Sequence, residues 1–236
     1  MADEGVRKST SPPADGSISH NLAGQKLGRK GQRTRERILE SALRLLHDPR
    51  GAPVTLSNVA REASVQLTNL YLYFPDIGEL VLGALARVMD VDTEFMELVR
   101  RRWPDEGLGM SCVAFIEAHY LFWRRHARIL HLRNTMADTD ARLLEYRQQV
   151  SMPLLHALVQ QMDGNPARED STSAMAMVIL TGVERLATVL TNPNFHIVPD
   201  EPREGVVDEE VRPLLAAQAK LLELAIRNQR VPSAAQ

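Results

Sequence analysis

The stretch from Thr55 to Phe74, TLSNVAREASVQLTNLYLYF, is the most informative part of this 236-residue chain. Thr55 is a residue type that caps helices, and the apolar residues after it recur every three or four positions, as one buried helix face requires. The pattern then passes through a short turn at Ala63-Ser64-Val65 into a second helical segment. The stretch therefore predicts two short helices joined by a tight turn.

The second of these helices carries polar and aromatic side chains where a core helix would carry aliphatic ones. Val65 and Leu70 are placed to anchor it against the first helix. The remaining amides, hydroxyls and rings suit base edges, thymine methyl groups and phosphates, and Thr68, Asn69 and Leu72 are the expected base readers. The predicted DNA-contacting residues of the stretch are Thr55, Gln66, Leu67, Thr68, Asn69, Tyr71, Leu72 and Tyr73.

Positive charge is concentrated just before this stretch. Residues 26–37 hold six basic residues and one acid, a local net charge of +5 in a chain whose formal charge is −2. Such a run attracts a polyanion, because neutralising phosphates releases condensed counterions. The alternative is an ordinary solvated charged tail. In the first interpretation Arg29, Lys30 and Arg33 contact the DNA backbone or the minor groove.

These residues resemble the N-terminal pattern of the TetR family of one-component transcriptional regulators. The resemblance rests on Thr34–Ile38, on Leu70–Phe74 and Glu79-Leu80, and on the apolar positions between them. It implies an all-α fold with a three-helix helix-turn-helix DNA-binding head and a C-terminal helical ligand-binding and dimerisation domain. It also implies a homodimer on a palindromic double-stranded DNA operator, most often a repressor that a small-molecule effector releases.

Three positions depart from the family pattern. Ser64 stands where the family usually has a glycine in the turn, so it must accept a positive φ or shift the turn. Gln66 stands where a serine or threonine usually caps the recognition helix. Ile77 occupies a place where a lysine commonly touches phosphate. Each departure weakens the transfer of a residue role but leaves the predicted fold in place.

Composition agrees with a helical protein that stays in the cytoplasm. With 44% hydrophobic residues the chain can form a sizeable core, and its one cysteine suits a reducing compartment. The sequence predicts no signal peptide and no membrane-spanning segment. The predicted divisions are a disordered tail (1–28), the DNA-binding domain (29–76), a helical effector-binding and dimerisation domain (77–230) and a flexible C-terminus (231–236).

Helix signals subdivide these domains. The first helix is expected to begin near Arg33 or Thr34, and Asp76 with Glu79 forms a capping-box pattern that opens a long helix ending before Pro104. Further helices are expected over about 110–125, 127–137, 139–162, 173–190 and 208–228.

The last two predicted helices carry more apolar residues than one buried face needs. The family resemblance pairs them with the same helices of a second chain, and the alternative is that the chain's own helices cover them. The predicted dimer-interface residues are Ile179, Gly182, Val183, Leu186, Leu190, Leu214, Leu215, Leu221 and Leu222.

An aromatic stripe in the helical domain has two interpretations. Its spacing places it on one helix face, where it forms either ordinary core or the wall of an effector pocket. The candidate pocket residues are Trp103, Phe115, His119, Tyr120, Phe122, Trp123, Asn134 and His156.

The sequence carries no motif of catalysis or metal binding. His119 and His126 lie seven residues apart, about 10.5 Å along a helix, too far to share one metal ion. There is no nucleophile elbow, phosphate loop or cysteine pair, so we expect no catalytic residues, metal or cofactor. A constitutive dimeric DNA-binding regulator without an effector remains one alternative, and a helical-bundle enzyme or carrier is another.

Overall fold

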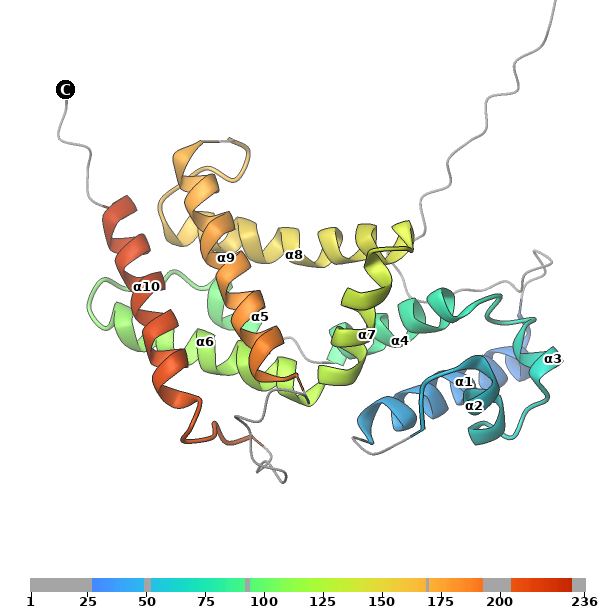
Figure 1. The fold of residues 1–236 in the computed structure, drawn as a ribbon. Coiled ribbons are helices and arrows are strands. Elements are labelled where there is room, and N and C mark those ends of the chain that lie inside the picture. Colours follow the sequence, from blue (N-terminus) through green and yellow to red (C-terminus); the bar gives the residue numbers. More distant parts are fainter. Residues whose placement is uncertain (1–26, 49–51, 92–93, 169, 193–204, 231–236) are drawn as a thin grey trace, which may run out of the picture.

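The computed structural model describes residues 27–48, 52–91, 94–168, 170–192 and 205–230 (Figure 1). Within these ranges all regular structure is helical, which confirms the predicted all-α class. The predicted C-terminal segment 231–236 and all but two residues of the predicted tail lie outside the described residues. The helices are α1 (Arg29–His47), α2 (Leu56–Glu62), α3 (Leu67–Leu70), α4 (Ile77–Val91), α5 (Glu94–Arg100), α6 (Leu108–Arg125), α7 (Ala127–Ala137), α8 (Ala141–Gln161), α9 (Ser171–Leu190) and α10 (Arg212–Arg230).

Helices α1, α2 and α3 form a small head with its own core. The predicted cap of α2 is present, since Thr55 Oγ1 accepts a 3.1 Å hydrogen bond from the backbone N–H of Asn58. Apolar residues at helical spacing on α1 and α2 close over Leu70, which is fully buried. The buried head core consists of Ile38, Leu39, Ala42, Val59, Ala60, Ala63, Leu70, Phe74 and Leu80.

Helix α4 joins the head to a larger helical body. Asp76 caps it as predicted, with Oδ1 accepting a 2.9 Å hydrogen bond from the backbone N–H of Glu79. Leu80 lies in the head core, whereas Val81 and Leu85 lie in the core of the body. One continuous helix therefore belongs to both cores, and a tilt of the body against the head must move it.

The body is built from α4 to α10 around a second, larger core. Helix α6 packs against α10 and α5, and α8 packs against α9 and α7. Figure 1 shows α9 and α10 on the side of the body away from the head. This placement leaves the outer faces of the last two helices clear of the head.

Helix α9 is, by length and composition alone, long and apolar enough to cross a membrane. A core helix of a globular protein meets the same criterion. Ala176, Leu180 and Val183 of α9 are buried in the body, which accounts for one apolar face. The helix also carries the adjacent charges Glu184 and Arg185.

Several helix ends differ from the prediction. Helix α1 begins at Arg29, four residues early, because Gly28 accepts a backbone hydrogen bond from Gln32 and starts the first turn. Of the helix predicted from Asp76 towards Pro104, the described residues contain α4 and α5, which ends at Arg100, whereas residues 92 and 93 lie outside the described residues. Helix α10 begins next to Pro213, whose missing N–H costs nothing in a first turn.

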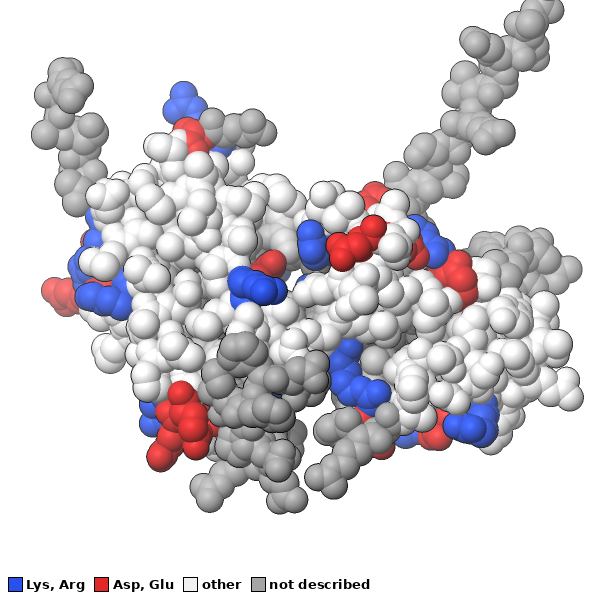
Figure 2. Space-filling model, in the orientation of Figure 1, with Lys and Arg blue, Asp and Glu red and all other residues white. Residues whose placement is uncertain are grey.

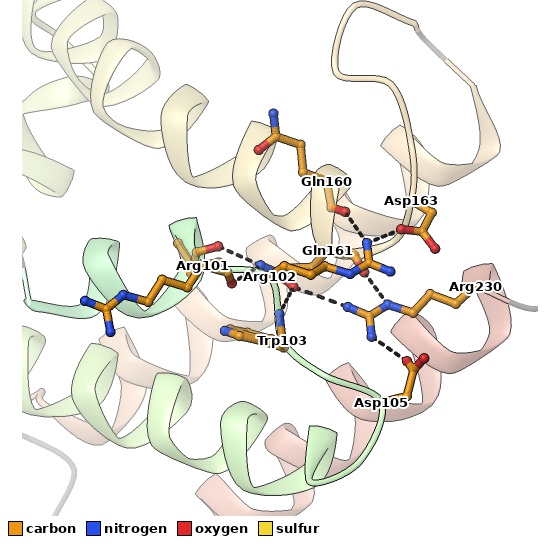
Figure 3. A network of polar contacts seen from close by, with 9 residues as sticks. Arg101, Arg102, Trp103, Asp105, Gln160, Gln161, Asp163 and Arg230 are labelled. Atoms are coloured by element: carbon orange, nitrogen blue, oxygen red, sulfur yellow. Dashed lines mark hydrogen bonds and ion pairs between the residues drawn. The ribbon is translucent and has the colours of Figure 1, made fainter.

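A buried polar network joins the ends of α5, α8 and α10 (Figure 3). Gln161 is buried, and its Nε2 donates to the carbonyls of Val99 and Arg101 at 2.8 and 2.7 Å. Its Oε1 accepts from the backbone N–H of Trp103 at 3.0 Å, and its own carbonyl accepts from Arg230 Nε at 2.8 Å. Because the side-chain amide of Gln161 has hydrogen-bond partners for both its nitrogen and its oxygen, the network holds the three helix ends together.

Candidate DNA-binding surface

The segment around α3 holds most of the predicted DNA-contacting side chains at the surface. Leu70 anchors the segment, and Leu67 and Tyr73 are half-buried against the head core. Tyr71 and Leu72 have relative exposures of 43% and 54%, unusual for large apolar side chains in a well-packed head. The predicted contacts that are exposed are Thr55, Gln66, Thr68, Asn69, Tyr71 and Leu72.

The turn before α3 resolves the question raised by Ser64. Ser64 adopts a left-handed conformation with φ of 51°. The backbone N–H of Val65 then donates to the carbonyl of Ala60 at 2.9 Å, which closes the end of α2 as a glycine turn would. A non-glycine residue in this conformation costs about 1–2 kcal/mol. The head therefore keeps the turn geometry at a small cost in stability.

Helix α3 itself is a single α-helical turn. Gln66 caps it without a side-chain hydrogen bond, as expected for a residue that caps poorly. After Leu70 the chain continues as a turn, in which the N–H groups of Tyr73 and Phe74 donate to the Leu70 carbonyl at 2.9 and 3.0 Å. The surface predicted as one longer helix is thus a short helix followed by a tight turn.

The basic residues at the start of α1 are free to meet phosphate. Arg29, Lys30 and Arg33 are exposed, and none forms an ion pair with a described residue. All three lie on α1, although the first helix was expected to begin only near Arg33 or Thr34. Arg35 differs, because its guanidinium lies 5.0 Å from the centre of the Phe74 ring and burial lowers its pKa. Arg35 supports the head, whereas the other three supply surface charge.

Arg142 of α8 ties the body to the start of α4. Its Nη2 donates to Asp76 at 3.0 Å and to Asp140 at 2.7 Å, and its Nη1 donates to Glu79 at 3.3 Å. Asp140 also caps α8, so the one guanidinium joins the caps of two helices. A Cβ added at Gly78 would lie 2.4 Å from Asp140 Oδ2 and 2.6 Å from Arg142 Nη2. A side chain at position 78 would therefore push the ends of Asp140 and Arg142 aside.

A second arginine joins α7 to the head. Arg128 Nη1 donates to the carbonyl of Leu45 at 2.6 Å and also to that of Asp48, and its Nη2 donates to the carbonyl of Ala52 at 3.3 Å. These carbonyls lie at the end of α1 and just before α2. Nothing in the sequence distinguishes Arg128 and Arg142 from surface arginines except that Arg142 follows a helix-capping aspartate by two residues.

Two clefts lie close to these elements. The first, of about 480 Å³, lies between the start of α4 and the junction of α7 with α8, and the second, of about 570 Å³, lies between α5 and α6. The first is lined by Asp76, Ile77, Gly78, Met136, Thr139, Asp140, Ala141 and Arg142. The second is lined by Glu97, Leu98, Arg101, Arg102, Trp103, Pro104, Met110, Ser111 and Ala114.

The candidate effector residues divide between core and surface. Four buried rings follow one another: Trp103, Phe115, His119 and Trp123. The distances between the centres of successive rings are 5.7, 6.2 and 6.3 Å. The stripe is buried, and of these four only Trp103 lines a described cleft.

The other four candidates lie apart from this run. Tyr120 donates a 3.2 Å hydrogen bond to Asp208, and Phe122 contacts His126 with tilted rings whose centres are 5.1 Å apart. Asn134 is half-buried, and its Oδ1 accepts from the neighbouring Arg133. His156 is exposed on α8 and lines neither described cleft. Its spacing alone did not show which side of α8 faces the core.

The predicted dimer-interface residues also divide. Val183, Leu190, Leu215 and Leu222 are buried within the chain, so their assignment to a free surface is wrong: they face the body's own core. Ile179, Gly182 and Leu186 are half-buried. Leu214 and Leu221 are exposed, and so are three residues that the sequence did not single out. The exposed apolar residues of α9 and α10 are Met177, Val178, Leu214, Leu221 and Leu224.

Comparison with known proteins supports the fold. No family model matches the chain, and no curated protein matches it. Among solved structures, the chain is similar to a TetR-like transcriptional regulator from Rhodococcus sp. RHA1, with a TM-score of 0.53 and 14% sequence identity. The likeness covers 86% of this chain and 97% of that one. The chain thus has the helical fold of TetR-like regulators over nearly its whole length.

Proposed function

We propose that the chain is a cytoplasmic transcriptional regulator of the TetR type that binds a palindromic operator as a homodimer and represses transcription until a small effector releases it. The observation that carries this proposal is the exposed polar and aromatic surface of α3 on a separately packed head. Exposed basic residues at the start of α1 accompany that surface. Polar side chains at base edges supply sequence preference, and the arginines supply attraction to phosphate.

A second copy of the chain is needed for this design. Two recognition segments enter successive major grooves when they are about 34–36 Å apart, a spacing that only a dimer provides. The exposed apolar residues of α9 and α10 are suited to that contact, and Figure 2 shows a broad uncharged area over this part of the body. Their distance from the head leaves the DNA-binding surfaces free.

Release follows from the links between head and body. Arg142 holds the start of α4 and Arg128 holds the end of α1, so a change in α7 or α8 alters the orientation of the head. An effector that binds better to an arrangement with the wrong head spacing shifts the population away from the operator-bound state. It does so only by its difference in affinity between the two states.

Genomic footprinting of the protein followed by titration on the sites found tests this function. We expect Asn69→Ala to lose about 1–3 kcal/mol on the operator with little change on random DNA, because it removes one base contact. Arg33→Ala should weaken both complexes and lower the salt slope by about 0.9 for each phosphate that the protein no longer neutralises. Gln32→Ala, at an exposed neutral neighbour on the same helix, is the matched control.

The titrations also separate the rival functions. Failure of the wild-type protein to bind any DNA at low salt would contradict the proposal and favour a helical-bundle carrier or enzyme. DNA binding that no small molecule alters would favour a constitutive regulator. Equal losses on operator and random DNA for Asn69→Ala would remove Asn69 from the base-reading set.

A further inference from the structure

Arg133 of α7 is a buried cation for which the described residues provide no ion-pair partner. Its relative exposure is only 5%. Its Nε and Nη2 both donate to the side-chain oxygen of Asn134, at 3.2 and 3.0 Å, and Nη1 has no hydrogen-bond partner among the described residues. A buried charge of this kind is expensive unless something else compensates it.

Two more polar groups near Arg133 lack partners within the described ranges. Arg147 of α8 is half-buried and forms no ion pair or hydrogen bond with a described residue, and the same holds for the hydroxyl of Tyr146. Burial, followed by the positive charge of Arg147, lowers the pKa of the Arg133 guanidinium, and Glu184 opposes this. Burial raises the pKa of Tyr146 to about 12, so the phenol is a neutral donor.

Aromatic side chains lie beside Arg133. The Arg133 guanidinium lies 5.6 Å from the centre of the Trp123 ring, and the buried imidazole of His119 lies 6.3 Å from that ring. Glu184 of α9, the one described acid with a marked influence on Arg133, has its carboxylate hydrogen-bonded to Ser151 at 3.0 Å. Two arginines and one glutamate leave a net charge of +1, which matches a monoanion.

We infer that Arg133, with Arg147 and Tyr146, forms the polar end of a binding site for a small organic carboxylate whose apolar body lies against Trp123. Arginine is the residue best suited to a carboxylate in a buried site, since its donors form charge-assisted hydrogen bonds. The aromatic or aliphatic part of the ligand would pack against apolar side chains, as is usual in small-molecule sites. A dianion such as a phosphate monoester would leave one charge uncompensated.

The location connects this site to the head, and in this respect the inference rests on the proposed function. Arg133 lies five residues along α7 from Arg128, which holds the carbonyls at the end of α1. Tyr146 lies four residues along α8 from Arg142, which holds the cap of α4. A carboxylate between α7 and α8 therefore acts on both helices that contact the head, and we expect it to weaken operator binding.

Tryptophan fluorescence of the full-length protein tests the site without DNA. The probes are benzoate, phenylacetate and octanoate, each compared with its neutral amide, together with phenyl phosphate. We expect at least one carboxylate to quench the fluorescence and raise the melting temperature, with affinity about tenfold or more above that of its amide and of phenyl phosphate. Arg133→Gln should reduce that affinity about tenfold or more, and Arg133→Lys should reduce it less.

Further variants keep the test decisive if Arg133→Gln folds poorly. Arg147→Gln changes a half-buried residue and should weaken carboxylate binding, whereas Arg168→Gln, at an exposed loop arginine, should not. Absence of binding by all three carboxylates, equal affinity for carboxylate and amide, tighter binding of phenyl phosphate, or unchanged affinity in both Arg133→Gln and Arg147→Gln would each overturn the inference.

A parallel operator titration separates this inference from the proposed function. A protein that binds its operator but no carboxylate retains the regulator function and loses the site. A protein that binds a carboxylate through Arg133 but no DNA retains the site and loses the regulator function.

Discussion

The guanidinium of Arg142 on α8 donates a 3.0 Å hydrogen bond to the carboxylate of Asp76, the residue that caps α4. Burial favours the protonated acid, but the hydrogen bonds from Arg142 and from the Glu79 backbone outweigh it and hold the pKa of Asp76 below its usual value. The ion pair is therefore complete at neutral pH and breaks only as the pH falls through that lowered pKa. It joins the helical body to the first turn of the helix that enters the head.

Breaking this ion pair should change DNA binding more than stability. Arg142 is 43% exposed, so Arg142→Gln should cost about 1 kcal/mol or less in the free energy of unfolding. Gly78→Ala should displace the same side chains while making α4 up to about 1 kcal/mol more favourable. We expect both variants to weaken operator affinity in fluorescence-anisotropy titrations, with melting temperatures close to that of the wild type.

Arg100→Gln is the control, because Arg100 forms an exposed ion pair with Glu97 within α5. Operator affinities of Arg142→Gln and Gly78→Ala equal to that of this control would show that the Arg142–Asp76 ion pair does not set the head orientation.

Exposed residues on α9 and α10 provide a test of the dimer. Val178 and Leu221 are 68% and 56% exposed in the single chain, so an acidic side chain at either position is tolerated in a monomer. In a dimer the same charge is buried without a partner. We expect wild-type protein to be a dimer burying about 1,200 Å² or more, and Val178→Asp and Leu221→Asp to be folded monomers by light scattering.

Two comparisons make this test specific. Val183→Glu should unfold the protein rather than separate the chains, because Val183 is 3% exposed in the body core. Met152→Glu, at an exposed position of α8, should leave the dimer intact. A wild-type protein that is monomeric at micromolar concentration contradicts the dimer outright.

Local signals in the sequence were enough to predict the head. Thr55 and Asp76 each accept a hydrogen bond from the backbone N–H three residues further on, and both caps form as predicted. Periodicity was less informative for the last helices, because heptad spacing marks apolar residues on both faces of a helix. It grouped the buried Leu222 with the exposed Leu221, and only the packing against α6 and α9 separates them.

The links between head and body were out of reach of the sequence. Arg142 and Asp76 are 66 residues apart, and an arginine on a helix resembles any solvated charge until the fold places carboxylates around it. The same holds for Arg133, whose burial depends on how other helices pack around α7. Patterns of spacing report what one helix buries, whereas these contacts depend on how helices from distant parts of the chain are placed.

The aromatic stripe on α6 should behave as core. Phe115 is fully buried between Trp103 and His119, so Phe115→Ala leaves a cavity costing about 3–5 kcal/mol. We expect the melting temperature to fall by on the order of 10 °C, with operator binding decreasing in parallel as the folded fraction falls. Normal stability with an altered effector response would instead identify Phe115 as part of a pocket wall.

Stability should fall in mild acid because of His119. Burial first, and the charge of Arg133 second, lower the pKa of this imidazole to about 3. In the unfolded chain it titrates near 6.5, so between about pH 6.5 and pH 3 the unfolded state binds a proton that the folded state does not. The contribution of neutral His119 to the free energy of unfolding is complete above about pH 6.5 and decreases by about 1 kcal/mol per pH unit below pH 6.

Urea denaturation between pH 7 and 4.5 should show this slope. His119→Gln should flatten the slope, while His156→Gln, at an exposed position on α8, should leave it unchanged. Equal slopes in wild type and His119→Gln would mean that other groups cause the loss of stability in acid.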